Sequence, residues 1–518
     1  MLERADTYEA LRAGFRWEIP DRLNLAEQVC DGWANREPER LAILDLSEER
    51  AERVSYARLH ALSLRVEDVL RRRGVAEGDR VGVLLSQSAL CAAAHVAAWR
   101  MGAISVPLFK LFREDALRSR LEDSGAHVVV TDTEGSGMLA PFGVVPVTRA
   151  DLPEEGRGGP VAQTGPETPA VLIYTSGTTG KPKGALHGHR VLTGHLPGVE
   201  MSHDFLGQEG DMLWTPADWA WIGGLFDVLM PGLALGVPVV AVREAKFSPK
   251  ILTRVAKAGA RNVFLPPTAL RMLKAEDASV RGLRSVASGG EPLGAEMLAW
   301  GRAALGVTIN EFYGQTECNM VASSCGALFD VRPGCLGRAA PGFDVGVIDA
   351  DGQETEGEGD IAIRRGAGSM MLEYWNNPAA TAEKFRGEWL VTGDRGVIED
   401  GFIRFVGRED DVITSGGYRI GPAEIEDCLM THPGVATVGV VGKPDAMRTE
   451  IVKAYVVAKQ GASVSPEELQ DWVKARLAAH SYPREVALVE DLPMTVTGKV
   501  IRKELKRRAV AETEGGGA

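Results

Sequence analysis

The sequence predicts an α/β protein that is built from more than one domain. Three observations support this: the length of 518 residues, an alternation of apolar runs with helix-like segments in the first half, and a different pattern beyond about residue 340. At roughly 100–200 residues for each domain, this length corresponds to two to four hydrophobic cores. The chain is 45% apolar and 25% charged, which excludes collagen-like and wholly disordered classes.

The first half is expected to form α/β layers around buried strands. Short apolar runs predict strands at 80–85, 127–131, 170–174, 237–242 and 262–265. An Ala-rich segment at 90–101 predicts a helix. The stretch 154–168 is rich in Gly, Pro and charged residues, so we expect a surface connection there.

The second half changes to shorter strands. Apolar runs at 345–348 and 361–363, bounded by Gly and acidic residues, indicate a small β-rich subdomain over about 340–407. Runs at 437–441 and 451–457 predict strands in a compact C-terminal piece. The last residues, 509–518, are expected to be a frayed tail.

One helix of the C-terminal piece carries a clear start signal. Ser465 as N-cap, Pro466 in the first turn and Glu468 three residues after the cap are typical of a capping box. This helix is then expected to bury an apolar stripe made of Leu469, Trp472, Val473 and Leu477.

Composition excludes several classes of function. The chain carries 58 Lys and Arg against 71 Asp and Glu, a net charge of −13, so we expect no nucleic-acid partner. Its six cysteines include no CxxC pair, so zinc and redox motifs lack support and a reducing, cytoplasmic compartment is expected. The N-terminus lacks the apolar region of a signal peptide, and polar residues interrupt the longest apolar stretch, 81–108, so we expect no integral membrane segment.

The most informative segment is residues 174–184 (YTSGTTGKPKG), which directly follow a predicted strand. Glycines let backbone N–H groups approach an anion closely, and hydroxyls and lysines add donors and charge suited to phosphate. The spacings of a Walker A loop, a dinucleotide-binding GxGxxG and a GxSxG nucleophile elbow are absent from the sequence. The segment therefore predicts a phosphate-binding loop of another kind.

This string resembles the signature loop of the adenylate-forming superfamily, which includes acyl-CoA synthetases, luciferases and the adenylation domains of peptide synthetases. Further motifs similar to those of the family follow in the same order, up to about residue 505. The strings ADWAW at 217–221 and NLAE at 24–27 are similar to acetyl- and medium-chain acyl-CoA synthetases.

The resemblance also implies a domain organisation. A large multi-layer N-terminal domain would span residues 1–407 and include the β-rich subdomain. A hinge over 408–412 would join it to a small mobile α+β domain over 413–508.

Two motifs resemble the adenine and phosphate side of the family's site. Residues 289–293 (GGEPL) resemble the adenine loop, and residues 313–317 (YGQTE) resemble the most specific short motif. The resemblance implies that Tyr313 lies near adenine, that Thr316 contacts the α-phosphate and that Glu317 binds Mg²⁺. A hard cation prefers carboxylate oxygens and substrate phosphates, which suits that role of Glu317.

Four motifs resemble the ribose contact and the second domain. TGD at 392–394 resembles the family's ribose clamp. The carboxylate of Asp394 suits this role, because a carboxylate can accept hydrogen bonds from two hydroxyls at once. GREDD at 407–411 resembles the hinge, in which Arg408 reaches the nucleotide and the backbone of Asp410 absorbs a rotation. GGYR at 416–419 resembles the turn that lines the pantetheine tunnel, and the loop ending at Lys499 resembles the family's catalytic loop.

The resemblance thus implies a full set of contacts. The catalytic residues would be Lys499, Thr316 and Glu317, and the metal would be held by Glu317. The CoA tunnel would be lined by Gly416, Gly417 and Tyr418. The ATP or AMP contacts would come from Thr175, Ser176, Gly177, Thr178, Thr179, Lys183, Gly290, Glu291, Pro292, Tyr313, Gly314, Gln315, Asp394, Arg408 and Arg419.

The activity implied is an AMP-forming ligation of a carboxylic acid to CoA, with ATP, Mg²⁺ and CoA as the small molecules required. A carboxylate attacks the α-phosphorus of ATP and expels pyrophosphate, and a thiol then attacks the acyl carbon and AMP leaves. Lys499 would serve the first step and Gly417 with its neighbours the second, after the small domain rotates. The resemblance leaves a homodimer open.

Residue size bears on the acid. Relatives restricted to acetate or propionate carry Trp at the position of Gly314, where the indole closes the acyl pocket. Glycine is expected to leave that volume open, which favours an acid longer than propionate: medium-chain, branched or aryl. Trp221, Gly314 and Cys318 are expected to line this pocket, and Trp219 or Trp221 is a candidate to refill the gap.

Two other functions stay open at this point. The first is an adenylation enzyme that loads an amino or aryl acid onto a carrier-protein thiol, for which Asp227 offers a partner to an ammonium group. The second is a nucleotide-binding sensor without catalysis, which we would expect to lack Lys499, Glu317 or Asp394; all three are present.

Overall fold

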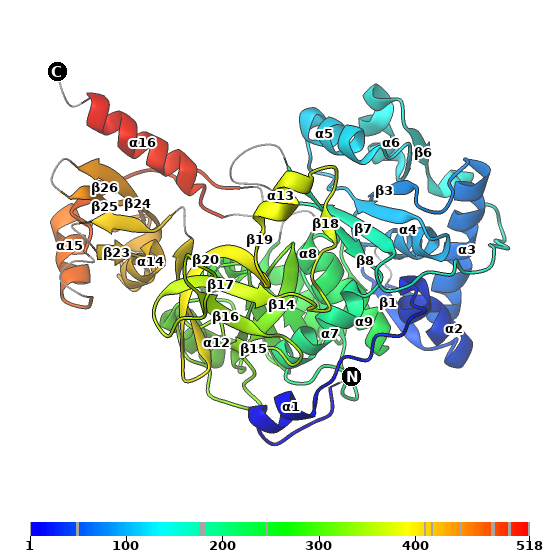
Figure 1. The fold of residues 1–518 in the computed structure, drawn as a ribbon, viewed down its shortest axis with the longest axis horizontal. Coiled ribbons are helices and arrows are strands. Elements are labelled where there is room, and N and C mark those ends of the chain that lie inside the picture. Colours follow the sequence, from blue (N-terminus) through cyan, green and yellow to red (C-terminus); the bar gives the residue numbers. More distant parts are fainter. Residues whose placement is uncertain are drawn as a thin grey trace.

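A computed structural model of the chain describes residues 2–47, 51–175, 182–244, 247–291, 293–408, 411–415, 418–445, 448–477, 482–495 and 499–515. The described residues form a large α/β body and a smaller C-terminal lobe, which lies at the upper left in Figure 1. The predicted fold class is confirmed. The exact domain boundaries, 1–407, 408–412 and 413–508, stay predictions.

One large sheet has the strand order β18-β8-β7-β4-β3-β5-β6 and is parallel at its centre, where β3 pairs with β4 and β5. Its strands are β3 (Arg80–Leu84), β4 (Ile104–Pro107), β5 (Val128–Thr131), β6 (Val145–Val147), β7 (Pro169–Tyr174), β8 (Gly184–Gly188) and β18 (Glu373–Tyr374). The short strand β18, which comes much later in the sequence, pairs antiparallel with β8 at the edge of this sheet.

The other large sheet has the order β15-β14-β13-β12-β11-β9-β10-β1-β2. Its strands are β1 (Leu41–Asp45), β2 (Glu52–Ser55), β9 (Leu213–Trp214), β10 (Val239–Ala241), β11 (Asn262–Phe264), β12 (Ser285–Gly289), β13 (Ile309–Gln315), β14 (Cys318–Ser323) and β15 (Arg338–Ala339). Strands β12 and β13 run parallel, so their carboxyl ends lie side by side.

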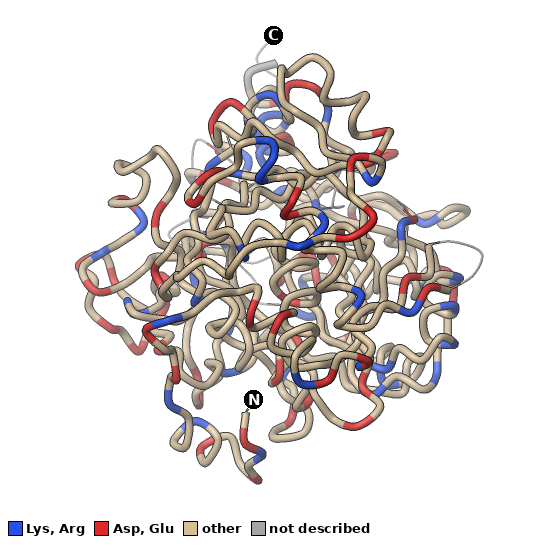
Figure 2. Tube along the Cα trace, turned by 90° about the vertical axis from the view of Figure 1, so that its right-hand side faces the viewer, with Lys and Arg blue, Asp and Glu red and all other residues tan. Residues whose placement is uncertain are grey.

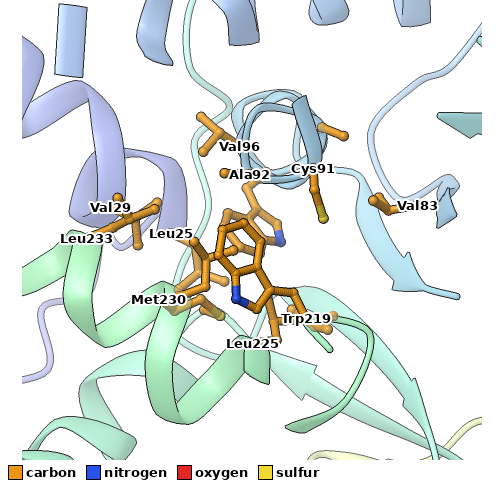
Figure 3. Packing of buried hydrophobic residues seen from close by; sticks show 14 of the residues in the cluster. Leu25, Val29, Val83, Cys91, Ala92, Val96, Trp219, Leu225, Met230 and Leu233 are labelled. Atoms are coloured by element: carbon orange, nitrogen blue, oxygen red, sulfur yellow. The ribbon is translucent and has the colours of Figure 1, made fainter. Parts of the chain in front are cut away.

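The main hydrophobic core lies between these two sheets. Helix α4 (Ala89–Arg100) is buried along nearly its whole length, which is why its sequence is apolar on all faces. Trp219 is fully buried and packs against Leu225 and Met230 near α4 (Figure 3). Trp219 therefore belongs to the core, and its role in refilling the acyl pocket stays a prediction.

The remaining helices cover the sheets. In the N-terminal body they are α1 (Tyr8–Gly14), α2 (Gly32–Arg36), α3 (Tyr56–Arg72), α5 (Glu114–Ser124), α6 (Thr133–Leu139), α7 (Val191–Ser202), α8 (Ile222–Gly224), α9 (Met230–Leu235), α10 (Pro249–Lys257), α11 (Pro267–Ala275), α12 (Ala295–Ala304) and α13 (Pro378–Glu383). Two short π-helical turns, η1 (Glu27–Asp31) and η4 (Leu225–Leu229), and two 3-10 turns, η2 (Ala140–Phe142) and η3 (Arg149–Asp151), complete the body.

The β-rich subdomain predicted beyond residue 340 is an antiparallel sheet of β16, β17, β20, β19 and β21. Its strands are β16 (Val345–Ile348), β17 (Gly359–Arg364), β19 (Phe385–Arg386), β20 (Trp389–Glu399) and β21 (Phe402–Arg408). Strand β21 leads directly into the predicted hinge.

The C-terminal lobe has a sheet and a core of its own. Its elements are β22 (Ile413–Ser415), β23 (Tyr418–Ile420), α14 (Pro422–Met430), β24 (Val435–Asp445), β25 (Thr449–Ala458), α15 (Pro466–Lys474), β26 (Glu485–Leu488) and α16 (Arg502–Gly515). The capping box at Ser465 and Glu468 is confirmed at the start of α15. Leu469 and Val473 are buried, and Trp472 and Leu477 pack against them.

Residues 509–515 differ from the expectation of a frayed tail. They continue α16, with Ala509 fully buried. The Glu512 carboxylate accepts hydrogen bonds from the buried Lys453 ammonium and from the Tyr455 hydroxyl, the latter at 3.1 Å. This long-range ion pair fixes the helix end.

Helix α16 is also tied to the residues after the hinge. Asp411 forms ion pairs with Arg502 at 3.6 Å and with Lys506 at 3.3 Å. Arg502 also pairs with Glu426 on α14.

The charged residues of the surface alternate in sign. In Figure 2, Lys and Arg are interspersed with Asp and Glu over the view shown. Within the described parts of the chain, no helix combines the length and the apolar character that crossing a bilayer requires.

Candidate active site

The predicted phosphate loop connects two antiparallel strands, β7 and β8. Tyr174 pairs with Gly184, and the Thr175 backbone N–H donates a hydrogen bond of 2.9 Å to the Lys183 carbonyl. The loop therefore starts at the end of β7 and returns at the adjacent start of β8, which places Thr175 and Lys183 side by side. The predicted contacts Ser176, Gly177, Thr178 and Thr179 lie outside the described residues.

The predicted adenine loop follows β12. Gly290 has φ of +96°, a left-handed conformation that favours glycine. Glu291 pairs with Arg271 at 2.8 Å, and Pro292 is outside the described residues. Because β12 and β13 are parallel neighbours, this loop and the YGQTE motif at the end of β13 meet at one edge of the sheet.

The predicted adenine and ribose residues contact one another. The Tyr313 hydroxyl donates a hydrogen bond of 2.6 Å to Oδ2 of Asp394 on β20. Burial and the neighbouring Asp394 carboxylate both raise the pKa of Tyr313, so it remains a neutral donor. The structure thus brings together two predicted site residues that are 81 positions apart in the sequence.

Thr392 holds the backbone of Asp394. Its hydroxyl donates to the Ile361 carbonyl at 2.7 Å and accepts from the Asp394 backbone N–H at 3.1 Å. The Thr392 carbonyl in turn accepts hydrogen bonds from Gln315 Nε2 and from Lys384 Nζ, both at 3.2 Å. The side chain of Gln315 therefore holds the ribose-side turn.

Glu317, the predicted magnesium ligand, is buried with 8% of its surface exposed. The Tyr374 hydroxyl donates a hydrogen bond to its Oε1, and the Lys183 ammonium lies 5.1 Å from the centre of the Tyr374 ring. Tyr374 was not predicted as a site residue. It reaches Glu317 because β18 pairs with β8, a pairing for which the local sequence has no signal.

These residues fit a magnesium ion that is held partly by substrate phosphates. Oε2 of Glu317 accepts no hydrogen bond from the described residues, so it is available to a cation. Among these residues, no group of three or more His, Cys, Asp or Glu side chains is arranged to hold a metal. Magnesium commonly uses one or two carboxylates together with phosphate oxygens and water, which matches a single carboxylate here.

Lys499 lies at the adenine loop although it belongs to the C-terminal lobe. A methyl group built on Gly290 would lie 3.4 Å from Lys499 Nζ. Lys499 N donates to the Thr495 hydroxyl at 3.0 Å, and the Thr495 N–H donates to the Lys499 carbonyl at 2.7 Å, which closes the turn before α16. The lobe is therefore placed with its predicted catalytic lysine beside the predicted adenine loop of the large domain.

Part of the predicted hinge and tunnel lies beyond what the structure describes. The Arg408 carbonyl accepts hydrogen bonds from the backbone of Asp411 at 2.9 Å and of Val412 at 3.0 Å. Asp410, Gly416 and Gly417 are outside the described residues, as are the side chains of Tyr418 and Arg419.

The predicted acyl pocket has an aromatic wall. The Trp221 ring lies 5.4 Å from the ring of Phe109 and 5.6 Å from that of Phe112, measured between centres. All three side chains are half-buried, so an apolar surface remains accessible. Cys318 is fully buried against Ser369, with 3.5 Å between Sγ and Oγ, and burial raises its thiol pKa to about 12.

The expectation that Gly314 leaves open volume needs correction. A methyl group built on Gly314 would overlap Oδ1 of Asn319 and lie 2.6 Å from Asn319 Cα and Met320 N. The turn from β13 into β14 therefore fills this space, and glycine is required by the close approach of β14. A side chain cannot enter here without moving that strand.

Asp227 lies behind this turn. The Asn319 side-chain amide donates a hydrogen bond of 2.8 Å to Asp227 Oδ1. Burial raises the pKa of Asp227 well above its usual range, only partly offset by this hydrogen bond. Burial therefore favours the neutral form of Asp227, and the Asn319 amide occupies its Oδ1.

Comparison with known proteins decides the family. The model of the AMP-binding enzyme matches residues 30–375, and that of the AMP-binding enzyme C-terminal domain matches residues 424–499. The chain belongs to the AMP-binding enzyme family.

Individual relatives agree with this assignment. Over 94% of its length the chain is 33% identical to acetyl-coenzyme A synthetase of Bacillus subtilis, covering 90% of that protein. It is 32% identical to mitochondrial acyl-coenzyme A synthetase ACSM3 of mouse, over 97% of this chain and 93% of that one. Among solved structures, the anthranilate CoA ligase AuaEII with anthranoyl-AMP superposes with a TM-score of 0.86 at 25% identity, covering 96% of this chain and 99% of that one. This AMP-binding enzyme is an AMP-forming ligase of the acyl-CoA synthetase type.

Proposed function

We propose that this enzyme activates a carboxylic acid longer than propionate, of the medium-chain, branched or aryl class, as its acyl-adenylate and transfers the acyl group to CoA. The observation that supports a large acyl group is the accessible aromatic wall formed by Trp221, Phe109 and Phe112. It suits an apolar chain or a ring.

The nucleotide would lie between the carboxyl ends of the parallel strands β12 and β13 on one side and strand β20 on the other. We propose that Tyr313 and the adenine loop contact the base, that Asp394 accepts the ribose hydroxyls, and that Thr316 and Thr175 contact phosphate. Tyr313 fixes the Asp394 carboxylate, and Thr392 fixes its backbone, so that both oxygens hold their orientation before ribose binds.

We propose that Glu317 holds Mg²⁺, oriented by Tyr374. When bound, the ion would neutralise phosphate charge. Lys499 would bring a compact positive charge to the point where the substrate carboxylate meets the α-phosphate. In the first step, the carboxylate oxygen bonds to the α-phosphorus and pyrophosphate leaves with the electron pair of the broken P–O bond.

In the second step, the thiolate of CoA bonds to the acyl carbon and AMP leaves with the electron pair of the C–O bond. The thiol proton passes to solvent. We propose that rotation about Asp410 removes Lys499 between the steps and brings Gly416, Gly417 and Tyr418 to the pantetheine path, with Arg419 at the phosphates.

Loading of an amino acid onto a carrier protein receives less support. An ammonium group is best held by a charged carboxylate, whereas burial raises the pKa of Asp227, which favours its neutral form, and Asn319 occupies its Oδ1. A reducing, cytoplasmic location is a further proposal, supported by six cysteines that are all free.

The deciding experiment is AMP release with ATP, Mg²⁺ and a panel of acids, with and without CoA. The panel runs from acetate to dodecanoate and includes branched acids, benzoates and amino acids. We expect CoA-dependent turnover with an acid longer than propionate. Turnover restricted to acetate would refute the proposed acid class, and pyrophosphate exchange without CoA thioester would favour carrier loading.

A further inference from the structure

Lys384 lies beside the turn that carries Asp394, within the proposed nucleotide site, although no sequence motif includes it. It is the residue after α13, it is half-buried, and its ammonium donates a hydrogen bond of 3.2 Å to the Thr392 carbonyl. Gln315 of the YGQTE motif donates to the same carbonyl at 3.2 Å. The ammonium is therefore held at the turn that carries Asp394.

The charged groups that act on Lys384 all belong to the proposed site. Burial lowers its pKa, the carboxylates of Glu317 and Asp394 raise it, and the cations of Arg408 and Lys183 lower it. These four groups come from four different segments of the chain. Lys384 also lies near enough to Cys318 to act on its thiol.

The ammonium lacks an ion-pair partner within the described part of the chain. No carboxylate among these residues lies within 4 Å of Nζ, and the Thr392 carbonyl is its one hydrogen-bond acceptor there. Partial removal of an ammonium from water without an adjacent counter-charge costs free energy, and its remaining N–H donors are open to further acceptors. An anionic ligand would supply both.

The order of groups along a nucleotide identifies that anion. Ribose would lie at Asp394 and the metal at Glu317, and the α-phosphate is the group between ribose and the metal-bound phosphates. The Thr392 carbonyl that holds the Lys384 ammonium is two residues from Asp394, and it also accepts from Gln315, which is two residues from Glu317. The ammonium therefore lies between the ribose-side and the metal-side segments. On the basis of the proposed function, we propose that Lys384 is a fixed cation of the nucleotide site, which stays beside the α-phosphate in both half-reactions.

This role differs from that of Lys499. Lys499 belongs to the C-terminal lobe and would leave after the adenylate forms, whereas Lys384 is part of the large domain and would remain. In thioester formation, the sulfur of CoA bonds to the acyl carbon, the C–O bond to phosphate breaks, and its electron pair stays on AMP. Lys384 would stabilise the negative charge that develops on that phosphate.

The test compares Lys384→Met, Lys384→Gln and Lys384→Arg with wild type. AMP affinity is measured by calorimetry, and both half-reactions are measured with the best acid of the panel and with its synthetic acyl-adenylate. We expect Lys384→Met to weaken AMP binding and to slow both half-reactions about tenfold or more, because interactions with charged groups have that magnitude. Lys384→Arg should recover most of the loss.

Lys384→Gln separates charge from structure. Glutamine can still donate to the Thr392 carbonyl but carries no charge, so we expect it to resemble Lys384→Met. Recovery by glutamine would show that the lysine only holds Thr392, and would overturn the proposal. Unchanged AMP affinity in Lys384→Met, or a loss confined to adenylation, would overturn it as well.

A matched control removes a lysine far from the site. Lys474→Met loses an exposed ammonium on α15, and its AMP affinity should equal that of wild type. AMP binding needs no acid, so a panel without turnover would contradict the proposed function while leaving the calorimetric test of Lys384 intact.

Discussion

Tyr313 donates its hydroxyl hydrogen to Oδ2 of Asp394 at 2.6 Å, and so joins the end of β13 to the middle of β20. The two residues belong to different sheets, and their contact joins the segments that are proposed to hold adenine and ribose. The Asp394 carboxylate that is proposed to hold ribose is therefore oriented by the residue that is proposed to contact adenine.

Tyr313→Phe should weaken nucleotide binding. The ring stays in place but the Asp394 carboxylate loses a donor, and hydrogen bonds to charged groups contribute about 1.5–3 kcal/mol. We expect KM for ATP to rise by about tenfold or more with a smaller change in kcat. Tyr455→Phe, which loses a hydroxyl-to-carboxylate bond to Glu512 in the other lobe, is the control and should keep the wild-type KM. Equal KM values in the two variants would contradict the prediction.

Tyr374→Phe should raise the concentration of Mg²⁺ required. Without the hydroxyl, Glu317 loses the partner that orients its carboxylate. Second partners of metal ligands commonly change metal affinity by about 10–100-fold. The measurement is a Mg²⁺ titration of AMP release at saturating ATP. A titration curve that superposes on that of wild type would remove Tyr374 from the metal site.

Gly314→Ala should destabilise the large domain. Its methyl group would overlap Asn319, and overpacking of this kind costs about 1–3 kcal/mol. Thermal unfolding should show a lower Tm, and Gly314→Trp should be worse or fail to fold. If Gly314→Trp folds with wild-type Tm and prefers shorter acids, the site does hold open volume at this position.

Lys499→Ala should separate the half-reactions. Adenylation should be lost, because the charge next to the substrate carboxylate and the α-phosphate is removed. Thioester formation from a supplied acyl-adenylate should keep its rate, since the proposed rotation removes Lys499 before that step. Rapid-quench assays of each half-reaction measure this, and an equal loss in both would refute the division of labour.

Asp218 should make the stability of the fold depend on pH. Burial raises its pKa from 3.8 to about 6, so the folded state favours the protonated form. Its contribution is fully present below pH of about 4 and is lost as pH rises through about 6. Asp218→Asn cannot titrate, so the free energy of unfolding of wild type should fall relative to the variant over this range.

Urea denaturation at several pH values measures that difference. Buried histidines such as His187 and His203, whose pKa values burial lowers to about 3, act in the opposite direction. They are present in both proteins and cancel in the comparison. Parallel stability curves for Asp218→Asn and wild type would exclude Asp218 as the source.

Local patterns predicted those parts of the structure that local contacts determine. The strand before the phosphate loop and the capping box at Ser465 depend on residues within a few positions of one another, and both were predicted. Apolar runs predicted the strands because burial on both faces leaves little alternative. The family motifs predicted Tyr313 and Asp394, but not that they contact each other.

The missed features depend on tertiary contacts. Tyr374 reaches Glu317 only because β18 joins β8, and Lys384 reaches the site only because the chain returns after α13. Asn319 fills the space at Gly314 because of a tight turn between two strands, which residue size alone does not predict. Residues 509–515 continue α16, and Glu512 ties this helix end to Lys453, 59 positions away.

The ion pairs from Arg502 and Lys506 to Asp411 have a mechanical consequence. Asp411 is the residue after the proposed pivot, and Arg502 follows Lys499 by three positions. These ion pairs fasten the segment after the pivot to the start of α16, which follows Lys499. The lobe, including Lys499, can therefore rotate about the hinge as one rigid body. A small rotation at the pivot then moves the Lys499 ammonium over a large distance. The lobe needs no internal refolding between the two chemical steps.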